Sequence, residues 1–346
     1  MAIRETDTAA LERDNLFQLN VLLWSTLPQP SVAPMTPVLL HKGFRLRAIE
    51  QPLDADVMQQ RRLGRCSIDI RPNPVVDVML ESDTNNQPLC ILLECKSGSF
   101  GIDSNSAPQA RGLIVAGGSI ETRGFTEYGS FAELCYLVPQ VDAAAMDTTL
   151  SSLAEQIREE GLPVCTSASL GLRVTSEGVY LATGSPQSSA HIAFEFRSAQ
   201  RVIEVRPDED PRPLYLIPWV PDGTVTDDSV LREKIWQELA LWIAHLPLSG
   251  GELAFGTLLE GVSRGAYGYW RNRESLRGHV WPKVRVIVEA LLTSEDVTVG
   301  QHSLTVRLIS ESHREHLLET MRVAQVPEPL PPGVQISLDE HLDRAK

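Results

Sequence analysis

Lysine is nearly missing from this sequence. Only five of the 31 basic residues are lysines, at positions 42, 96, 234, 283 and 346, and the others are arginines. Basic charge is also in deficit, because 45 Asp+Glu residues give the 346-residue chain a formal net charge of −14. Such a chain does not coat nucleic acid non-specifically, although a local basic segment can still bind it. With so few lysines, the position of each one is informative.

Paired cysteines and long apolar runs are absent as well. The five cysteines (Cys66, Cys90, Cys95, Cys135 and Cys165) include no Cys-x-x-Cys, so neither a disulfide framework nor a zinc site is indicated. We expect free thiols in a reducing, cytoplasmic compartment. No apolar run approaches the roughly 18–20 residues of a membrane helix, and the first residues lack a signal-peptide pattern, so no membrane association is expected.

Glycine-rich nucleotide sites are excluded too. The segments at 97–101 and 116–119 match neither the P-loop, nor the dinucleotide fingerprint, nor the serine-hydrolase elbow. His313 and His316 stand three apart on an expected helix, but without a nearby cysteine we favour an exposed pair over a metal site.

The pattern up to residue 205 mixes helical and extended segments. Helices are expected over 8–25, 109–116 and 148–160. Extended segments are expected at 38–40, 44–49, 66–70, 75–80, 89–93, 134–138, 178–182 and 192–196, and from 164 onward. The polar turn at 82–87 joins two of them into a hairpin. We therefore predict an α/β domain over residues 1–205, with a mixed central sheet flanked by helices.

The remaining residues change character three times. Residues 206–228 form a Pro-rich connector, and residues 326–346 form a Pro-rich tail that we expect to be flexible. Between them, residues 229–325 give helices near 229–246, 252–262 and 279–292, a hairpin of 297–299 with 304–309, and a helix over 312–323. Three helices followed by a hairpin predict a smaller winged-helix-like α+β domain.

Two apolar strands of the predicted hairpin carry charged residues. Asp77 lies within 74–80, and Glu94 and Lys96 lie at the end of 90–96. Residues two apart on a strand project from one face, and Asp77 on the neighbouring strand can face the same way. Charges in such strands carry a desolvation cost unless they are paired or bind a metal. The sequence thus predicts two carboxylates and an ammonium converging at one sheet end.

This arrangement resembles the PD-(D/E)XK nuclease superfamily, whose restriction-endonuclease-like core runs helix, active-site hairpin, helix and further strand. The resemblance covers about residues 8–200 in element order, but only Asp77, Glu94 and Lys96 match the motif. It implies catalytic roles for these three residues and for Gln109, and one or two Mg²⁺ (or Mn²⁺) ions held by Asp77, Glu94 and the backbone carbonyl of Cys95. Lys96 would orient the attacking water and offset charge on the phosphate.

The chain departs from the family pattern in its first acid. Two valines separate Pro74 from Asp77, which are adjacent in many members, and Asp69 is a competing carboxylate. Some members add a glutamate on the first helix, for which Glu12 is the weaker candidate. The alternative for Glu94 and Lys96 is an ordinary salt bridge on a half-exposed sheet face.

One short segment is strongly basic. Residues 263–286 contain Glu274 as the only acid, four aromatic residues (Tyr267, Tyr269, Trp270 and Trp281) and six basic residues: Arg264, Arg271, Arg273, Arg277, Lys283 and Arg285. Arginine forks bind phosphates and aromatic rings stack on bases, so these six are candidate nucleic-acid contacts. The alternative is a solvated helix face over core aromatics.

Two functions of different class follow. The first is a metal-dependent nuclease, an endonuclease or exonuclease acting on DNA foremost or on RNA, with restriction or anti-phage defence as an extension of the resemblance. The second is a non-catalytic nuclease-fold subunit that binds nucleic acid or scaffolds a larger complex, with a protein partner or a second copy docked through the C-terminal domain. A transcriptional regulator with a sensory first domain ranks third.

Overall fold

Alternating helices and strands build the first two hundred residues, as the mixed pattern predicts. The computed structural model describes residues 5–28, 35–55, 57–84, 87–119, 131–185, 188–204, 212–219, 228–271, 273–308 and 310–325. The helices of this part are α1 (Glu5–Glu12), α2 (Asn15–Thr26), α3 (Val38–His41), α4 (Val57–Leu63), α5 (Ala107–Gly118), α6 (Ala143–Glu159) and α7 (His191–Glu195). The strands are β1 (Arg45–Pro52), β2 (Val75–Thr84), β3 (Gln87–Cys95), β4 (Phe131–Pro139), β5 (Thr166–Thr175), β6 (Gly178–Thr183) and β7 (Gln200–Ile203).

These strands form one seven-stranded mixed sheet in the order of the chain, β1 to β7. The predicted hairpin is confirmed, since β2 and β3 pair antiparallel, with Val78 opposite Leu93. Strands β3, β4 and β5 are parallel to one another, whereas β1, β6 and β7 add antiparallel pairs outside them. The predicted fold class is thus confirmed as a mixed α/β architecture with a central sheet.

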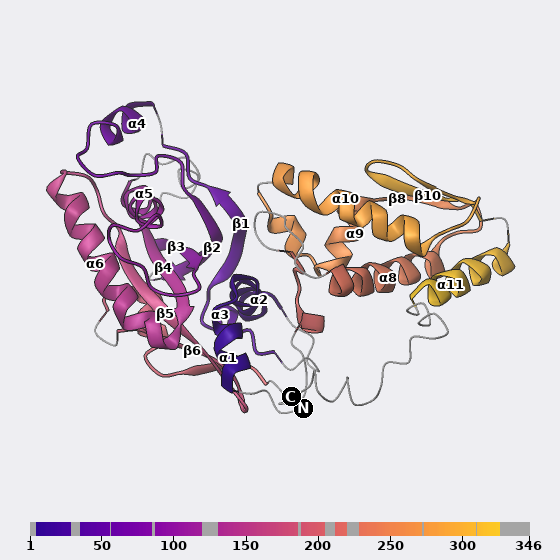
Figure 1. Cartoon of the computed structure of the whole chain (residues 1–346), viewed down its shortest axis with the longest axis horizontal. Helices are drawn as coiled ribbons and strands as arrows, with labels where there is room; N and C mark the ends of the chain where they lie inside the picture. Colours follow the sequence, from indigo (N-terminus) through magenta and orange to yellow (C-terminus); the bar gives the residue numbers. More distant parts are fainter. Residues whose placement is uncertain are drawn as a thin grey trace, which may run out of the picture. The chain divides into compact units, whose positions relative to one another are not determined.

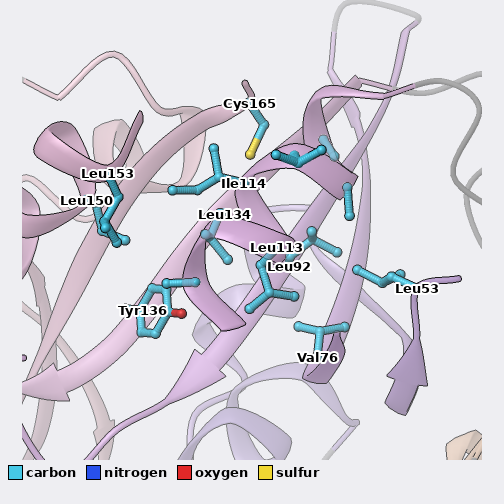
Figure 2. Close-up of a cluster of buried hydrophobic side chains, with 14 of the residues drawn as sticks. Leu53, Val76, Leu92, Leu113, Ile114, Leu134, Tyr136, Leu150, Leu153 and Cys165 are labelled. Atoms are coloured by element: carbon cyan, nitrogen blue, oxygen red, sulfur yellow. The ribbon is translucent and has the colours of Figure 1, made fainter. Parts of the chain in front are cut away.

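Helices cover both faces of this sheet: α5 and α6 lie on one side, and α2 and α3 on the other (Figure 1). The core under α5 and α6 is built from alternating apolar residues of the strands and from one stripe of each helix. Figure 2 shows Leu92, Leu134 and Tyr136 of the sheet in this layer with Leu150 and Leu153 of α6. Gly112 of α5 allows close approach, because a Cβ there would overlap the carbonyl oxygen of Arg71.

Several local predictions were wrong. The expected helix over 8–25 is two helices, because the Asp14 carboxylate caps α2 by accepting from the amides of Leu16 (2.8 Å) and Phe17 (3.4 Å). Segments 38–40 and 192–196, expected to be extended, are the short helices α3 and α7, and 66–70 is not a strand. Four- and five-residue helices are too short for an apolar period to reveal.

A second group of elements follows residue 227. It contains α8 (Asp228–His245), β8 (Gly251–Ala254), α9 (Phe255–Val262), α10 (Arg273–Leu291), β9 (Val297–Val299), β10 (Ser303–Val306) and α11 (Glu311–Gln325). Strands β8, β10 and β9 form a small antiparallel sheet in that order. The expected helix over 252–262 is therefore wrong in its first residues, since β8 pairs with the distant β10.

By Cα proximity the chain divides into two compact units, residues 1–231 with 259–283, and residues 232–258 with 284–346. Within the second unit, α8 and α11 are joined by Trp236 Nε1 donating to the Met321 carbonyl (3.2 Å) and by Arg232 Nη2 donating to the Ala324 carbonyl (2.8 Å). The boundaries predicted at 205, 228 and 325 stay predictions, and the tail at 326–346 lies outside the described residues.

Part of the predicted connector packs on the first unit. Asn20 of α2 donates to the Ile217 carbonyl (2.9 Å) and accepts from the Ile217 amide (3.0 Å). Trp24 Nε1 donates to the Leu214 carbonyl (3.0 Å), and residues 215–219 are buried. The apolar insert among the prolines therefore belongs to the core of this unit.

Both edges of the large sheet make further backbone contacts. At the β7 edge, Met35 bridges Ile203, and the Thr36 amide donates to the Val202 carbonyl (2.7 Å). At the β1 edge, Trp270 bridges Ile49, whose carbonyl accepts from the Arg271 amide (2.9 Å). All these residues lie in the first unit.

The structure also describes the cysteines and the lengths of the apolar helices. All five cysteines are free, with Cys66 half-buried and the other four buried. Among the described residues, no helix has the length and apolarity needed to cross a bilayer.

Candidate active site on the β2–β3 hairpin

The hairpin register brings the two predicted carboxylates together. Val78 pairs with Leu93, and the next step of the register sets Asp77 opposite Glu94 on the same face. The Asp77 amide donates to Glu94 Oε2 at 3.4 Å. Lys96 stands two residues beyond Glu94, so its side chain leaves the strand on this face too. The predicted convergence of Asp77, Glu94 and Lys96 is what the structure contains.

One oxygen of Glu94 carries most of its contacts. Lys96 Nζ lies 3.1 Å from Glu94 Oε1, and Gln109 Nε2 donates to the same oxygen at 2.7 Å. Gln109 reaches the site because Pro108 opens α5 and Gln109 lies on its first turn, where its amide also donates to the Val75 carbonyl (3.3 Å). The predicted partnership of Gln109 with the motif residues is therefore present.

Asp77 is held by the neighbouring strand. Its Oδ2 accepts from the Cys95 amide at 2.7 Å, and the Cys95 thiol also interacts with the carboxylate. Because a strand residue presents its amide and carbonyl to the same side, the Cys95 carbonyl also faces β2. Glu94 Oε2, with one contact at 3.4 Å, the Asp77 carboxylate and the Cys95 carbonyl are thus the oxygens that the site could offer to a cation.

Burial makes this charge cluster unusual. Glu94 is only 2% exposed, and its pKa rises to about 8, through burial first and the Asp77 charge second. Burial likewise raises the pKa of Asp77, against the opposing effects of the Cys95 amide and Lys96. For Lys96 the carboxylates outweigh burial, so its pKa is raised and the ammonium form is favoured. The cluster therefore holds one cation against two carboxylates that repel each other.

Helix α2 fixes the end of β3 from the opposite face. Gln18 is fully buried, and its Nε2 donates to the Lys96 carbonyl (2.8 Å) and to the Glu12 carbonyl (2.7 Å). Arg13 donates to the Ser97 carbonyl (2.7 Å) and pairs with Asp142 (3.1 Å). The Lys96 amide also donates to the Leu137 carbonyl (2.9 Å). Both backbone groups of Lys96 are therefore hydrogen-bonded.

Comparison of the chain with family models, with curated proteins and with solved structures found no match.

The donor set of the site is small and consists of oxygen atoms. The described residues contain no group of three or more His, Cys, Asp or Glu side chains able to hold a metal ion. Two carboxylates and one peptide carbonyl remain, and Mg²⁺ accepts such a set because it keeps several waters and binds one or two carboxylates with substrate phosphate. A divalent cation would also remove the repulsion between Asp77 and Glu94.

Two polar residues near the site were not anticipated from the sequence. Tyr136 on β4 is paired with Glu94 on β3, and its buried hydroxyl has no hydrogen-bond partner among the described residues. Burial first, and then the charges of Glu94 and Asp77, raise the Tyr136 pKa well above its usual value. Gln18, between Phe17 and Leu19 in a buried helix, is the other. A polar residue inside an apolar stretch is the signal that could have found each.

The weaker acid candidates lie elsewhere. Glu12 accepts from the Val174 amide on β5 (2.8 Å), so its carboxylate is engaged away from Asp77. Asp69 lies exposed in the loop before β2, where its carbonyl accepts from Arg111 (3.1 Å). Neither is joined to Glu94 or Lys96 by any hydrogen bond or ion pair between described residues.

The described basic side chains of the segment 263–286 are exposed, whereas two of its aromatic residues are buried. Arg264, Arg271, Arg277, Lys283 and Arg285 are exposed, whereas the Arg273 side chain lies outside the description. The Arg277 guanidinium lies 5.4 Å from the Trp281 ring centroid, and Arg285 pairs with Glu289 at 2.8 Å. Tyr267 and Trp270 are buried, so these two rings are core residues, as the alternative interpretation of the segment supposes.

Glu94 makes the stability of the metal-free protein depend on pH. Its folded pKa of about 8 lies above the ordinary value of 4.5, so the folded state retains a proton that the unfolded chain releases in between. The contribution of Glu94 to stability is therefore fully present below pH 4.5 and is lost as pH rises through about 8. We expect Glu94→Gln to remove up to ~5 kcal/mol of this loss in urea unfolding curves recorded in EDTA. Glu155→Gln on the exposed face of α6 is the control, and parallel curves for Glu94→Gln and wild type would contradict the assignment.

Proposed function

We propose that the chain is a metal-dependent nuclease of the PD-(D/E)XK kind, which hydrolyses phosphodiester bonds of DNA or RNA. The observation that carries the proposal is the convergence of Asp77, Glu94, Lys96 and Gln109 at one sheet end. A surface ion pair would require neither the burial of Glu94 nor a second carboxylate opposite it. Burying two carboxylates that repel each other costs free energy, and a bound cation would offset that cost.

The order of elements supports the same proposal. Helix α2, the strands β1–β3, helix α5 and the parallel strand β4 follow one another as the restriction-endonuclease-like core does. The second group, with its small sheet ordered β8–β10–β9, supports a winged-helix-like module. Arg277, Lys283 and Arg285, each exposed on α10, would contact phosphates, since arginine and lysine at exposed helix positions supply the charge for nucleic-acid binding.

Each residue of the site has a task in this scheme. Asp77, Glu94 and the Cys95 carbonyl would hold Mg²⁺ or Mn²⁺, which when bound polarises the phosphate and lowers the pKa of the attacking water. Gln109 and Lys96 hold Glu94 Oε1, which leaves Oε2 on the side of Asp77. Lys96 keeps its proton, so it donates hydrogen bonds to the attacking water or the phosphate and offsets developing negative charge.

The metal tests this proposal directly. We expect Mn²⁺ or Mg²⁺ added to EDTA-treated protein to raise the melting temperature, by the equivalent of ~2.7 kcal/mol at a hundredfold excess over Kd. Asp77→Asn should abolish the shift and also the cleavage of plasmid, single-stranded DNA or RNA. Asp69→Asn, which changes the competing carboxylate, is the matched control and should retain both.

The second candidate is a non-catalytic subunit of nuclease fold. The small donor set and the acidic composition favour it. Folded protein that shows neither a metal-induced shift nor cleavage of any of these substrates would leave this candidate and remove the first.

A further inference from the structure

A second hollow lies on the same face of the sheet as the candidate site. It has a volume of about 640 Å³ and is lined by β5 and β6, with Arg173 and Tyr180 paired across the two strands. Ala182 and Ala199 also line the hollow, and their side chains are small. Gln140, just after β4, covers Gly171, where a Cβ would overlap the Gln140 amide. Small residues therefore open this space, and Gly171 allows the amide to lie at its edge.

Three polar side chains line this hollow, and the charge of one of them, Arg173, acts on the nearby Glu12 carboxylate. Neither the Gln140 amide, nor the Arg173 guanidinium, nor the Tyr180 hydroxyl makes a hydrogen bond or ion pair with another residue that the structure describes. They are a planar amide, a planar forked cation and an aromatic ring with a polar edge. A flat heteroaromatic ring with donors and acceptors along its edge matches all three, because Gln and Arg bind base edges in pairs of hydrogen bonds and tyrosine stacks on bases.

The register sets the hollow next to the site. Cys95 pairs with Leu137, and Val138 pairs with Gly171, so Lys96, the residue after β3, and Gly171 of β5 are separated by one strand. With ~4.8 Å between neighbouring strands, their backbones are roughly 10 Å apart. A nucleic-acid strand cleaved beside Lys96 would therefore reach the hollow with a nearby nucleotide.

We propose that this hollow binds an unstacked nucleobase of the substrate strand, next to the scissile phosphate. The inference rests on the proposed function for the identity of the strand. Glu177 lies at the rim of the hollow, and its carboxylate would repel a phosphate bound there. A neutral base avoids that repulsion while using the Arg173 donors and the ring of Tyr180.

Binding in EDTA tests the inference without any need for cleavage. We would measure the fluorescence anisotropy of labelled DNA and RNA hexanucleotides, each also made with one abasic position at a time. Wild type should bind the intact strand at least ~5-fold more tightly than the strand abasic at one position, the lower bound for base stacking. Tyr180→Leu and Arg173→Ala should bind both strands equally, at the weaker affinity. Arg158→Ala, an exposed arginine on α6, should behave as wild type.

The outcomes separate this inference from the nuclease proposal. Asp77→Asn should keep the preference for the intact strand, and base-dependent binding by a protein that never cleaves would support the hollow while removing the nuclease. Equal loss for intact and abasic strands on Arg173→Ala would show a phosphate contact and overturn the inference. Variants that bind as wild type, or no binding to either hexanucleotide, would overturn it too. Melting temperatures near the wild-type value confirm that each variant is folded.

Discussion

If the proposed hydrolysis of phosphodiester bonds is the activity of this chain, we expect Lys96→Met to lower its rate by about 10²- to 10³-fold, the usual effect of removing one preorganised donor from a developing anion. The reason is position. Lys96 Nζ lies 3.1 Å from Glu94 Oε1, and its backbone is fixed by Gln18 and Leu137. A methionine keeps the apolar stem and removes only the charge. Single-turnover cleavage at saturating Mg²⁺ measures the effect.

Lys42→Met is a closely matched control. Lys42 pairs with Glu195 at 2.9 Å and is 23% exposed, against 25% for Lys96. Both variants lose one half-buried lysine paired with a glutamate, but only Lys96 stands at the candidate site. Equal losses in the two variants would point to stability rather than chemistry, and full activity in Lys96→Met would refute the role given to Lys96.

We expect Asn20→Ala to destabilise the first unit by about 3 kcal/mol. The Asn20 side chain is fully buried and satisfies both backbone groups of Ile217, together with the Leu16 carbonyl. Its truncation leaves a buried amide and a buried carbonyl of Ile217 unpaired, each of which costs ~1–3 kcal/mol. Urea denaturation measures the loss.

The same substitution elsewhere on α2 gives the comparison. Asn15 is exposed on the first turn, so Asn15→Ala should change the free energy of unfolding by no more than ~0.5 kcal/mol. A cost below ~1 kcal/mol for Asn20→Ala would mean that the 212–219 segment is not held as part of the core.

The candidate site was largely predictable because its residues are local in strand geometry. The period of two sets Glu94 and Lys96 on one face, and a hairpin brings Asp77 across from Glu94. Gln109 follows from the helix that Pro108 opens. What no local pattern contains is the amide of Cys95 bound to Asp77, or Gln18 reaching Lys96 from a helix 78 residues earlier.

The errors in the fold have the same origin. The segment 192–196 reads as an apolar strand, but the Glu133 carboxylate on β4 accepts from the amides of His191 and Ile192 and fixes a helix start there. Residues 252–254 continue a helical pattern, yet they pair with β10 about fifty residues later. Long-range pairing overrides local preference at both places.

The backbone contacts at the two sheet margins restrict how copies of this chain can associate. An uncovered margin offers a row of free amides and carbonyls on which a second molecule can extend the sheet, which leads to aggregation. Here Met35 and Thr36 occupy one margin and Trp270 with Arg271 the other, while Arg45 and Arg47 place charge along the rest of β1. Extension of the large sheet by a strand of a second copy is thereby disfavoured.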